Sequence, residues 1–152
     1  MVRDPIPTWH FVLVVVRSED RFLLVHESEH GQAWYLPAGR IEFGETPLDA
    51  AHRETQEEAG VAIDIDGIIR IEHTPIQHGT RLRIIFSAHP SGDTLPKLKA
   101  DEHTLEAGWF NLEEMKRLRM RGDEVYQISE YLTNGGAIYP LSLLAYEGTP
   151  FE

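Results

Sequence analysis

Apolar residues along the chain are gathered in short runs rich in β-branched and aromatic residues, a pattern typical of strands. The first two runs, WHFVLVVV and RFLLVHE, are separated by a few polar residues and predict a hairpin. Two longer runs in the middle of the chain can also pair antiparallel, the first of them interrupted at Asp66–Gly67. The predicted strands cover residues 9–16, 21–27, 34–37, 62–74, 80–90 and 109–111.

Helical spacing of apolar positions appears in three segments, of which one has clear end signals. Thr46 is placed to be the N-cap of this helix, Pro47 suits its first position, Asp49 suits its first turn and Gly60 ends it. Two further helices are predicted at 112–118 and 123–133. We see no repeat or interdomain linker and expect a single domain over residues 1–152.

The helix that starts after Thr46 carries an unusual charge pattern. Glu54, Glu57 and Glu58 have the spacing i, i+3, i+4, which gathers three carboxylates on one face near the C-terminal end. This end is the negative pole of the helix dipole, where acidic side chains are unfavourable. Arg53 can pair with Glu57 but cannot neutralise all three. The glutamates border an apolar stripe formed by Leu48, Ala51, Thr55 and Ala59.

A divalent cation would account for this cluster. Mg²⁺ and Mn²⁺ prefer oxygen ligands, and Mg²⁺ in particular takes a few carboxylates and keeps other positions for waters and substrate phosphates. The sequence therefore predicts a Mg²⁺ or Mn²⁺ site at Glu54, Glu57 and Glu58.

Composition and charge exclude several classes of chemistry and of binding partner. The chain contains no cysteine, which excludes thiolate chemistry and disulfides and fits a reducing compartment, so we expect a cytoplasmic protein. A net charge of −11 argues against a nucleic-acid polymer as partner, and the apolar runs are too short to cross a membrane. A small phosphorylated ligand bridged by a cation remains compatible with this acidity.

The stretch from Gly39 to Val61 resembles an intact Nudix box. Gly39 is followed after five residues by Glu45 and after seven more by RETQEEAGV, with every charged and glycine position of the pattern present. The resemblance implies an α/β fold, an α/β/α sandwich around a mixed sheet, and hydrolysis of a nucleoside diphosphate linked to another group.

The resemblance also implies roles for individual residues. Glu54, Glu57 and Glu58 would hold the cations with help from the backbone carbonyl of Ala38 or Gly39. Arg53 and Glu45 would orient these carboxylates. Glu54 is our first choice for the general base, and Glu102 is preferred over Glu106 as the alternative on the loop before Trp109.

The substrate is less defined by the sequence. WYLPAGR and RETQEEAG are similar to the Nudix branch acting on oxidised guanine nucleoside diphosphates, whereas the tail ISEYLTNGGAIYPLSLL is similar to a small bacterial branch of nucleotide and pyrimidine-diphosphate phosphatases. Pro75 lies fifteen residues after Gly60, and a proline near this position is similar to the pattern of ADP-ribose pyrophosphatases, so that activity is an alternative. A non-catalytic binding module is a further alternative. Candidate substrate contacts are Arg40, Arg81 and Arg83 for phosphate and Phe86, Trp9 and Phe11 for stacking.

HESEH, residues 26–30, matches the H-E-x-x-H pattern of zinc peptidases. That chemistry needs both histidines on one face of a helix, but the segment follows a strand and meets Gly31 at once. We therefore interpret it as a turn.

Overall fold

The computed structural model describes residues 1–152 and contains one mixed sheet with helices on both faces. The strands are β1 (Thr8–Ser18), β2 (Arg21–Glu27), β3 (Trp34–Tyr35), β4 (Ala38–Arg40), β5 (Ile63–Ile76), β6 (Gly79–Pro90) and β7 (Thr104–Phe110). The helices are α1 (Pro47–Ala59), α2 (Leu112–Met115) and α3 (Glu124–Thr133), with 3-10 turns at His30–Gln32 and Leu141–Leu143.

The sheet runs in the order β3-β2-β1-β6-β5, with β4 also paired to β1 and β7 to β2. Only β1 and β6 are parallel; the other pairs, including the predicted β1–β2 hairpin and the β5–β6 pair, are antiparallel. The register of β5 shifts between Ile65 and Gly67, where the sequence predicts an interruption. None of the helices is long and apolar enough to cross a membrane.

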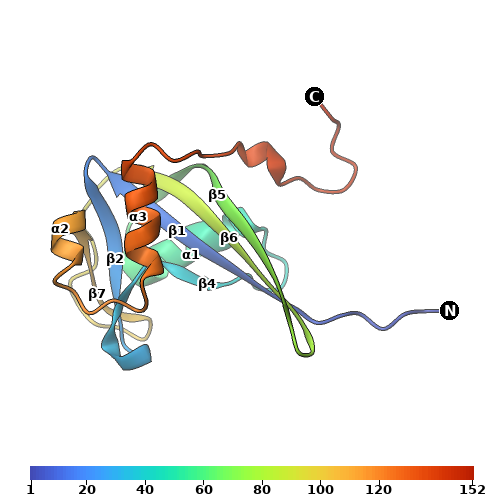
Figure 1. Ribbon diagram of the computed structural model, residues 1–152, viewed down its shortest axis with the longest axis horizontal. Helices are drawn as coiled ribbons and strands as arrows, with labels where there is room; N and C mark the ends of the chain where they lie inside the picture. The colour runs from blue at the N-terminus through green and yellow to red at the C-terminus, as the bar shows by residue number, and fades with distance from the viewer.

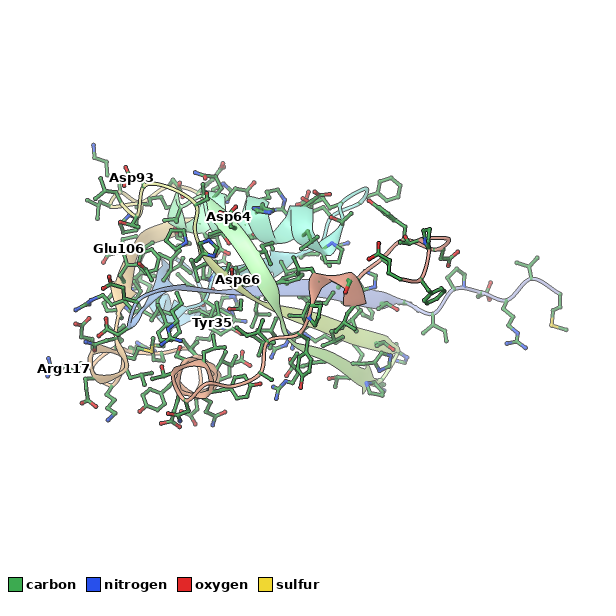
Figure 2. All side chains as sticks on the ribbon, turned by 90° about the horizontal axis from the view of Figure 1, so that it is seen from above. Tyr35, Asp64, Asp66, Asp93, Glu106 and Arg117 are labelled. Carbon is green, nitrogen blue, oxygen red and sulfur yellow. The ribbon has the colours of Figure 1, made fainter.

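Successive residues of the central strands supply two separate cores. Val12, Val14 and Val16 of β1 belong to the core beneath α1, whereas Leu13 and Val15 belong to the core beneath α3. Figure 2 shows α1 and α3 on opposite sides of the sheet. Figure 1 shows both chain termini projecting away from this body. The expected α/β/α sandwich is confirmed, and it places the glutamates of α1 on one face of the sheet.

Local chemistry fixes α1. The hydroxyl of Thr46 accepts a hydrogen bond from the Asp49 N–H at 3.1 Å, and the Asp49 carboxylate accepts one from the Thr46 N–H at 3.0 Å. Gly60 ends the helix with φ of 71°, a left-handed conformation that glycine adopts without steric cost. The limits predicted from the sequence are therefore confirmed.

Two predicted elements are wrong in extent. The helix expected at 112–118 stops at Met115, and the strand expected at 109–111 starts at Thr104 and ends at Phe110. The strand is longer because residues 104–110 pair along the open edge of β2, and this long-range contact cannot be predicted from the sequence of residues 104–110 alone. The short strand β4, which carries Gly39, was not predicted at all.

Candidate active site

Small residues bring α1 close to the sheet. Ala50, Ala51, Thr55 and Ala59 are buried, and the Thr55 hydroxyl donates to the Ala51 carbonyl at 2.8 Å, so that no polar atom of this stripe is left without a partner. The glutamates that border the stripe are consequently held against β4 and are only partly exposed.

Glu58 is the most deeply placed of the three carboxylates. Its Oε1 accepts a hydrogen bond from the Ala38 N–H at 2.9 Å. Burial raises the pKa of Glu58 to about 8, and the neighbouring carboxylates of Glu54 and Glu27 act in the same direction, while the Ala38 amide opposes them. An uncompensated charge at this position is therefore unfavourable.

The pKa of Glu58 predicts how stability depends on pH. Because the folded protein holds a proton on Glu58 up to pH about 8, and the unfolded chain loses it near 4.5, the free energy of unfolding of the metal-free protein should fall as the pH rises between these values. The raised pKa of Glu54, which is caused first by burial, adds to this trend. We expect a loss of a few kcal/mol, since one pKa unit corresponds to about 1.4 kcal/mol. Urea unfolding at a series of pH values measures it; a stability that is flat in this range, or equal in Glu58→Gln, would contradict the assignment.

Arg53 connects the acidic residues of the Nudix-like segment. Its guanidinium makes two hydrogen bonds to Glu45, at 2.7 and 2.9 Å, and also reaches Glu54 at 2.7 Å and Glu57 at 3.2 Å. A further N–H donates to the carbonyl of Arg40 at 3.0 Å. These bonds lower the pKa of Glu45 to about 2. The structure thus brings Arg53 and Glu45 together in the orienting arrangement that the sequence suggests.

Gly39 leaves room for the carboxylate of Glu54. A Cβ atom at this position would lie 2.1 Å from Cδ and Oε1 of Glu54, far inside van der Waals contact. The backbone of β4 therefore forms a cradle in which this carboxylate lies, and a Cβ atom would push the end of the Glu54 side chain out of it.

An acidic cavity of about 270 Å³ opens beside these residues. Glu54 and Glu58 of α1 line it together with Glu27 at the end of β2 and with Glu102 and His103. Glu27 and His103 were not predicted: Glu27 belongs to the HESEH segment, whose sequence predicts a turn, His103 lies in a segment with no motif, and both reach the cavity only through the fold. A larger apolar groove of about 670 Å³ lies between β5, α3 and the C-terminal tail and contains none of these carboxylates.

The three glutamates do not converge on one point. Glu54 and Glu57 are held by Arg53, and no group of three acidic or histidine side chains is close enough to bind a metal ion in this geometry. Like charges repel, so without a cation the arginine supplies the countercharge. The donor set still fits a hard cation, since it offers carboxylates, two of which have pKa values raised by burial, and the glycine cradle of β4.

Of the two loop candidates for a general base, Glu102 lies at the cavity and Glu106 does not. Glu102 is 86% exposed, and its Oε1 lies 3.5 Å from Nε2 of His103, whose Nδ1 is 3.9 Å from Glu57. Glu106 sits on β7 opposite His26 of β2.

The expected substrate contacts lie elsewhere in the fold. Phe86 has no exposed surface and packs in the core beneath α1, so its expected stacking on a substrate is wrong: its position in the strand points it into the protein. Ile84 of β6 points into the core beneath α1, and successive side chains of a strand point to opposite faces of the sheet. Arg81 and Arg83 therefore point to the face that α3 covers. Arg81 stacks on the Phe11 ring at 4.9 Å, while Arg40 is exposed at the end of β4, and Trp9 is 40% exposed.

Arg83 takes part in a network that the sequence did not reveal. It pairs with Glu124 of α3 at 2.7 Å and with Glu72 of β5, and Tyr35 donates a hydrogen bond to the same Glu124. Figure 2 shows Tyr35 on the side of the sheet that faces α3. Arg83 is therefore largely neutralised by protein carboxylates.

The HESEH segment is a turn, as expected. His26 is the last but one residue of β2 and its Nε2 lies 2.9 Å from the Gln32 carbonyl, and His30 begins a 3-10 turn. The two histidines do not share a helix face, as a zinc peptidase site would require.

Comparison with known proteins agrees with this geometry. A model of the NUDIX domain matches residues 7–130. The chain is 39% identical over 105 residues to the 8-oxo-dGDP phosphatase NUDT18 of Homo sapiens, covering 66% of this chain but 32% of that protein. It spans about a third of the length of the NUDT18 relatives it matches. It is 30% identical over 142 residues to phosphatase NudJ of Shigella boydii, covering 92% of each chain.

A NUDIX hydrolase structure from Nitrosomonas europaea superposes with a TM-score of 0.75 at 30% identity, covering 95% of this chain and all of that one. The matched residues contain the whole segment from Gly39 to Val61, together with β1, β6 and the cavity. The chain therefore belongs to the Nudix hydrolase family.

Proposed function

We propose that this chain hydrolyses the phosphoanhydride of a nucleoside diphosphate derivative, or of a similar small organic diphosphate, in a reaction that requires Mg²⁺ or Mn²⁺. The observation that carries the proposal is the pair of partly buried carboxylates, Glu54 and Glu58, at a cavity that also receives Glu27 and Glu102. So much negative charge beside a phosphate requires a cation.

Different residues at the cavity would bind the cation and accept the proton of the attacking water. Glu54, Glu57 and Glu58 would hold the cation together with the backbone carbonyl of Ala38 or Gly39. A bound cation would neutralise the pyrophosphate oxygens and lower the pKa of the attacking water. Glu54 is our first choice to accept the proton of this water, and Glu102, which also lines the cavity, is the alternative.

A compact diphosphate is supported by the relative that is named an 8-oxo-dGDP phosphatase, and the relative that is named a phosphatase agrees with phosphate chemistry. The net charge of −11 disfavours a nucleic-acid polymer as substrate.

Product release from a panel of substrates tests the proposal. Nucleoside diphosphates including 8-oxo-dGDP, together with ADP-ribose and a UDP-sugar, are incubated with Mg²⁺ or with excess EDTA, and the products are separated by chromatography. We expect turnover of a compact diphosphate that EDTA reduces to background. Turnover of ADP-ribose alone would reassign the substrate class, and no metal-dependent turnover of any compound would indicate a binding module.

A further inference from the structure

The C-terminal end of α1 is completed by a distant loop. The last turn of this helix contains no basic residue, and only one of its last four carbonyls, that of Gln56, is taken by the capping Gly60 N–H. The loop before β7 and the first residue of this strand supply the other partners. Lys97 makes two of these bonds: its Nζ donates to the Glu57 carbonyl at 3.0 Å, and its backbone N–H donates to the Ala59 carbonyl at 2.8 Å. The Thr104 hydroxyl donates to the Glu58 carbonyl at 2.6 Å.

The same lysine organises the loop itself. Lys97 Nζ pairs with Oδ1 of Asp101 at 2.7 Å, and its side chain is only 14% exposed. Oδ1 of Asp101 also accepts hydrogen bonds from the N–H groups of His103 at 2.8 Å and Thr104 at 3.2 Å. Residues 101–104 are closed further by a bond from the Asp101 N–H to the Thr104 carbonyl at 3.0 Å. The ammonium thus links a tight turn to the helix end.

This turn carries two groups into the acidic cavity. Glu102 and His103 lie between the two anchors, Asp101 and Thr104, and both line the cavity beside Glu54 and Glu58. Their own side chains are exposed, and Nδ1 of His103 approaches the carboxylate of Glu57 on the helix to 3.9 Å. The backbone anchors therefore determine where these two side chains stand.

We propose that Lys97, acting with Asp101, is a positioning residue that fixes Glu102 and His103 against the carboxylates of α1. The inference rests on the proposed hydrolysis at this cavity. Lys97 itself does not touch the cavity; it sets the distance between the loop and the helix and supplies the positive charge that the last turn of α1 lacks.

Lys97→Met tests the proposal, because it removes the ammonium and retains the apolar stem. We expect kcat to fall by about 10- to 100-fold with little change in KM. The substitution would displace Glu102, a candidate base, and the displacement of a catalytic group lowers the rate rather than the affinity for substrate. Lys97→Arg should recover part of the loss. Lys99→Met is the matched control, because Lys99 is exposed two residues further on and the same charge is removed; its kcat should equal that of the wild type.

A second readout does not depend on activity. In Lys97→Met the amides of His103 and Thr104 should exchange with deuterium at least about tenfold faster than in the wild type, while those of β1 and β6 stay protected. If Lys97→Met does not fold, Asp101→Asn replaces it, since the amide oxygen can still accept both N–H bonds but lacks the charge that pairs with Lys97. Wild-type kcat in both variants, or unchanged exchange in the turn, overturns the proposal. If the wild-type protein shows no turnover, the proposed hydrolysis is refuted but the positioning role is still tested. The exchange measurement reports on the contact of Lys97 with Asp101 and α1 without needing activity.

Discussion

Replacing Glu58 by glutamine is expected to leave the protein folded and to lower its metal-dependent turnover by about a thousandfold. The amide oxygen of glutamine can still accept the hydrogen bond from the Ala38 N–H, now 2.9 Å from Oε1, and the side chain keeps its volume. What disappears is the negative charge that would bind a cation at the cavity. The large effect follows because the charge is buried and nothing else in α1 occupies the same place.

Steady-state kinetics over a range of Mg²⁺ concentrations, with thermal unfolding in parallel, would measure this effect. Glu130→Gln is the matched control, since Glu130 is an exposed helical glutamate on α3 and the same charge is lost far from the cavity. The control should retain full activity. A fully active Glu58→Gln enzyme would refute the role of Glu58, and a protein that fails to fold would contradict the burial of a neutral Glu58 side chain in the metal-free protein.

The parts of the fold that were predictable are those specified by neighbouring residues. The limits of α1 depend on Thr46, Asp49 and Gly60, which interact within the helix itself. The position of Glu54, Glu57 and Glu58 beside the buried stripe then follows from helical periodicity alone.

The parts that were not predictable depend on contacts between distant segments. β7 extends to Thr104 because β2 offers a free edge, and Glu27 and His103 reach the cavity at the same end of this strand pair, where Glu27 lies opposite Thr104. The error over Phe86 has the same origin: on β6 the residue type gives no indication of which face is covered, and the pairing with β1 decides that it is buried.

The countercharge at the carboxylates was only partly foreseen. An i, i+4 pair between Arg53 and Glu57 is local and expected, but Arg53 also binds Glu45 and Glu54. These extra bonds, together with the proton that burial keeps on Glu58, explain how a helix end with three glutamates is stable before any cation binds. They also mean that Glu54 has little freedom to move aside, because Arg53 holds it at 2.7 Å while the backbone of Gly39 faces it from the sheet.

Gly39→Ala should for this reason lower kcat by about a hundredfold, although it adds a single methyl group. The new Cβ would stand 2.1 Å from the carboxyl carbon of Glu54, so that the carboxylate must leave its place beside Gly39 and its bond to Arg53. The displaced atoms are the end of a side chain that lines the cavity, so the free energy of unfolding should change little, which chemical unfolding can measure.

Gly92→Ala is the matched control for this substitution, since a Cβ at Gly92 meets no atom within 4 Å and its backbone is not left-handed. We expect it to match the wild type in kcat and stability. If Gly39→Ala were as active as Gly92→Ala, Glu54 could not be needed in the position that β4 reserves for it, and the general base would have to be sought at Glu102. The comparison therefore tests whether turnover needs the carboxylate of Glu54 in its place beside Gly39, because the substitution displaces this carboxylate and leaves its charge in the protein.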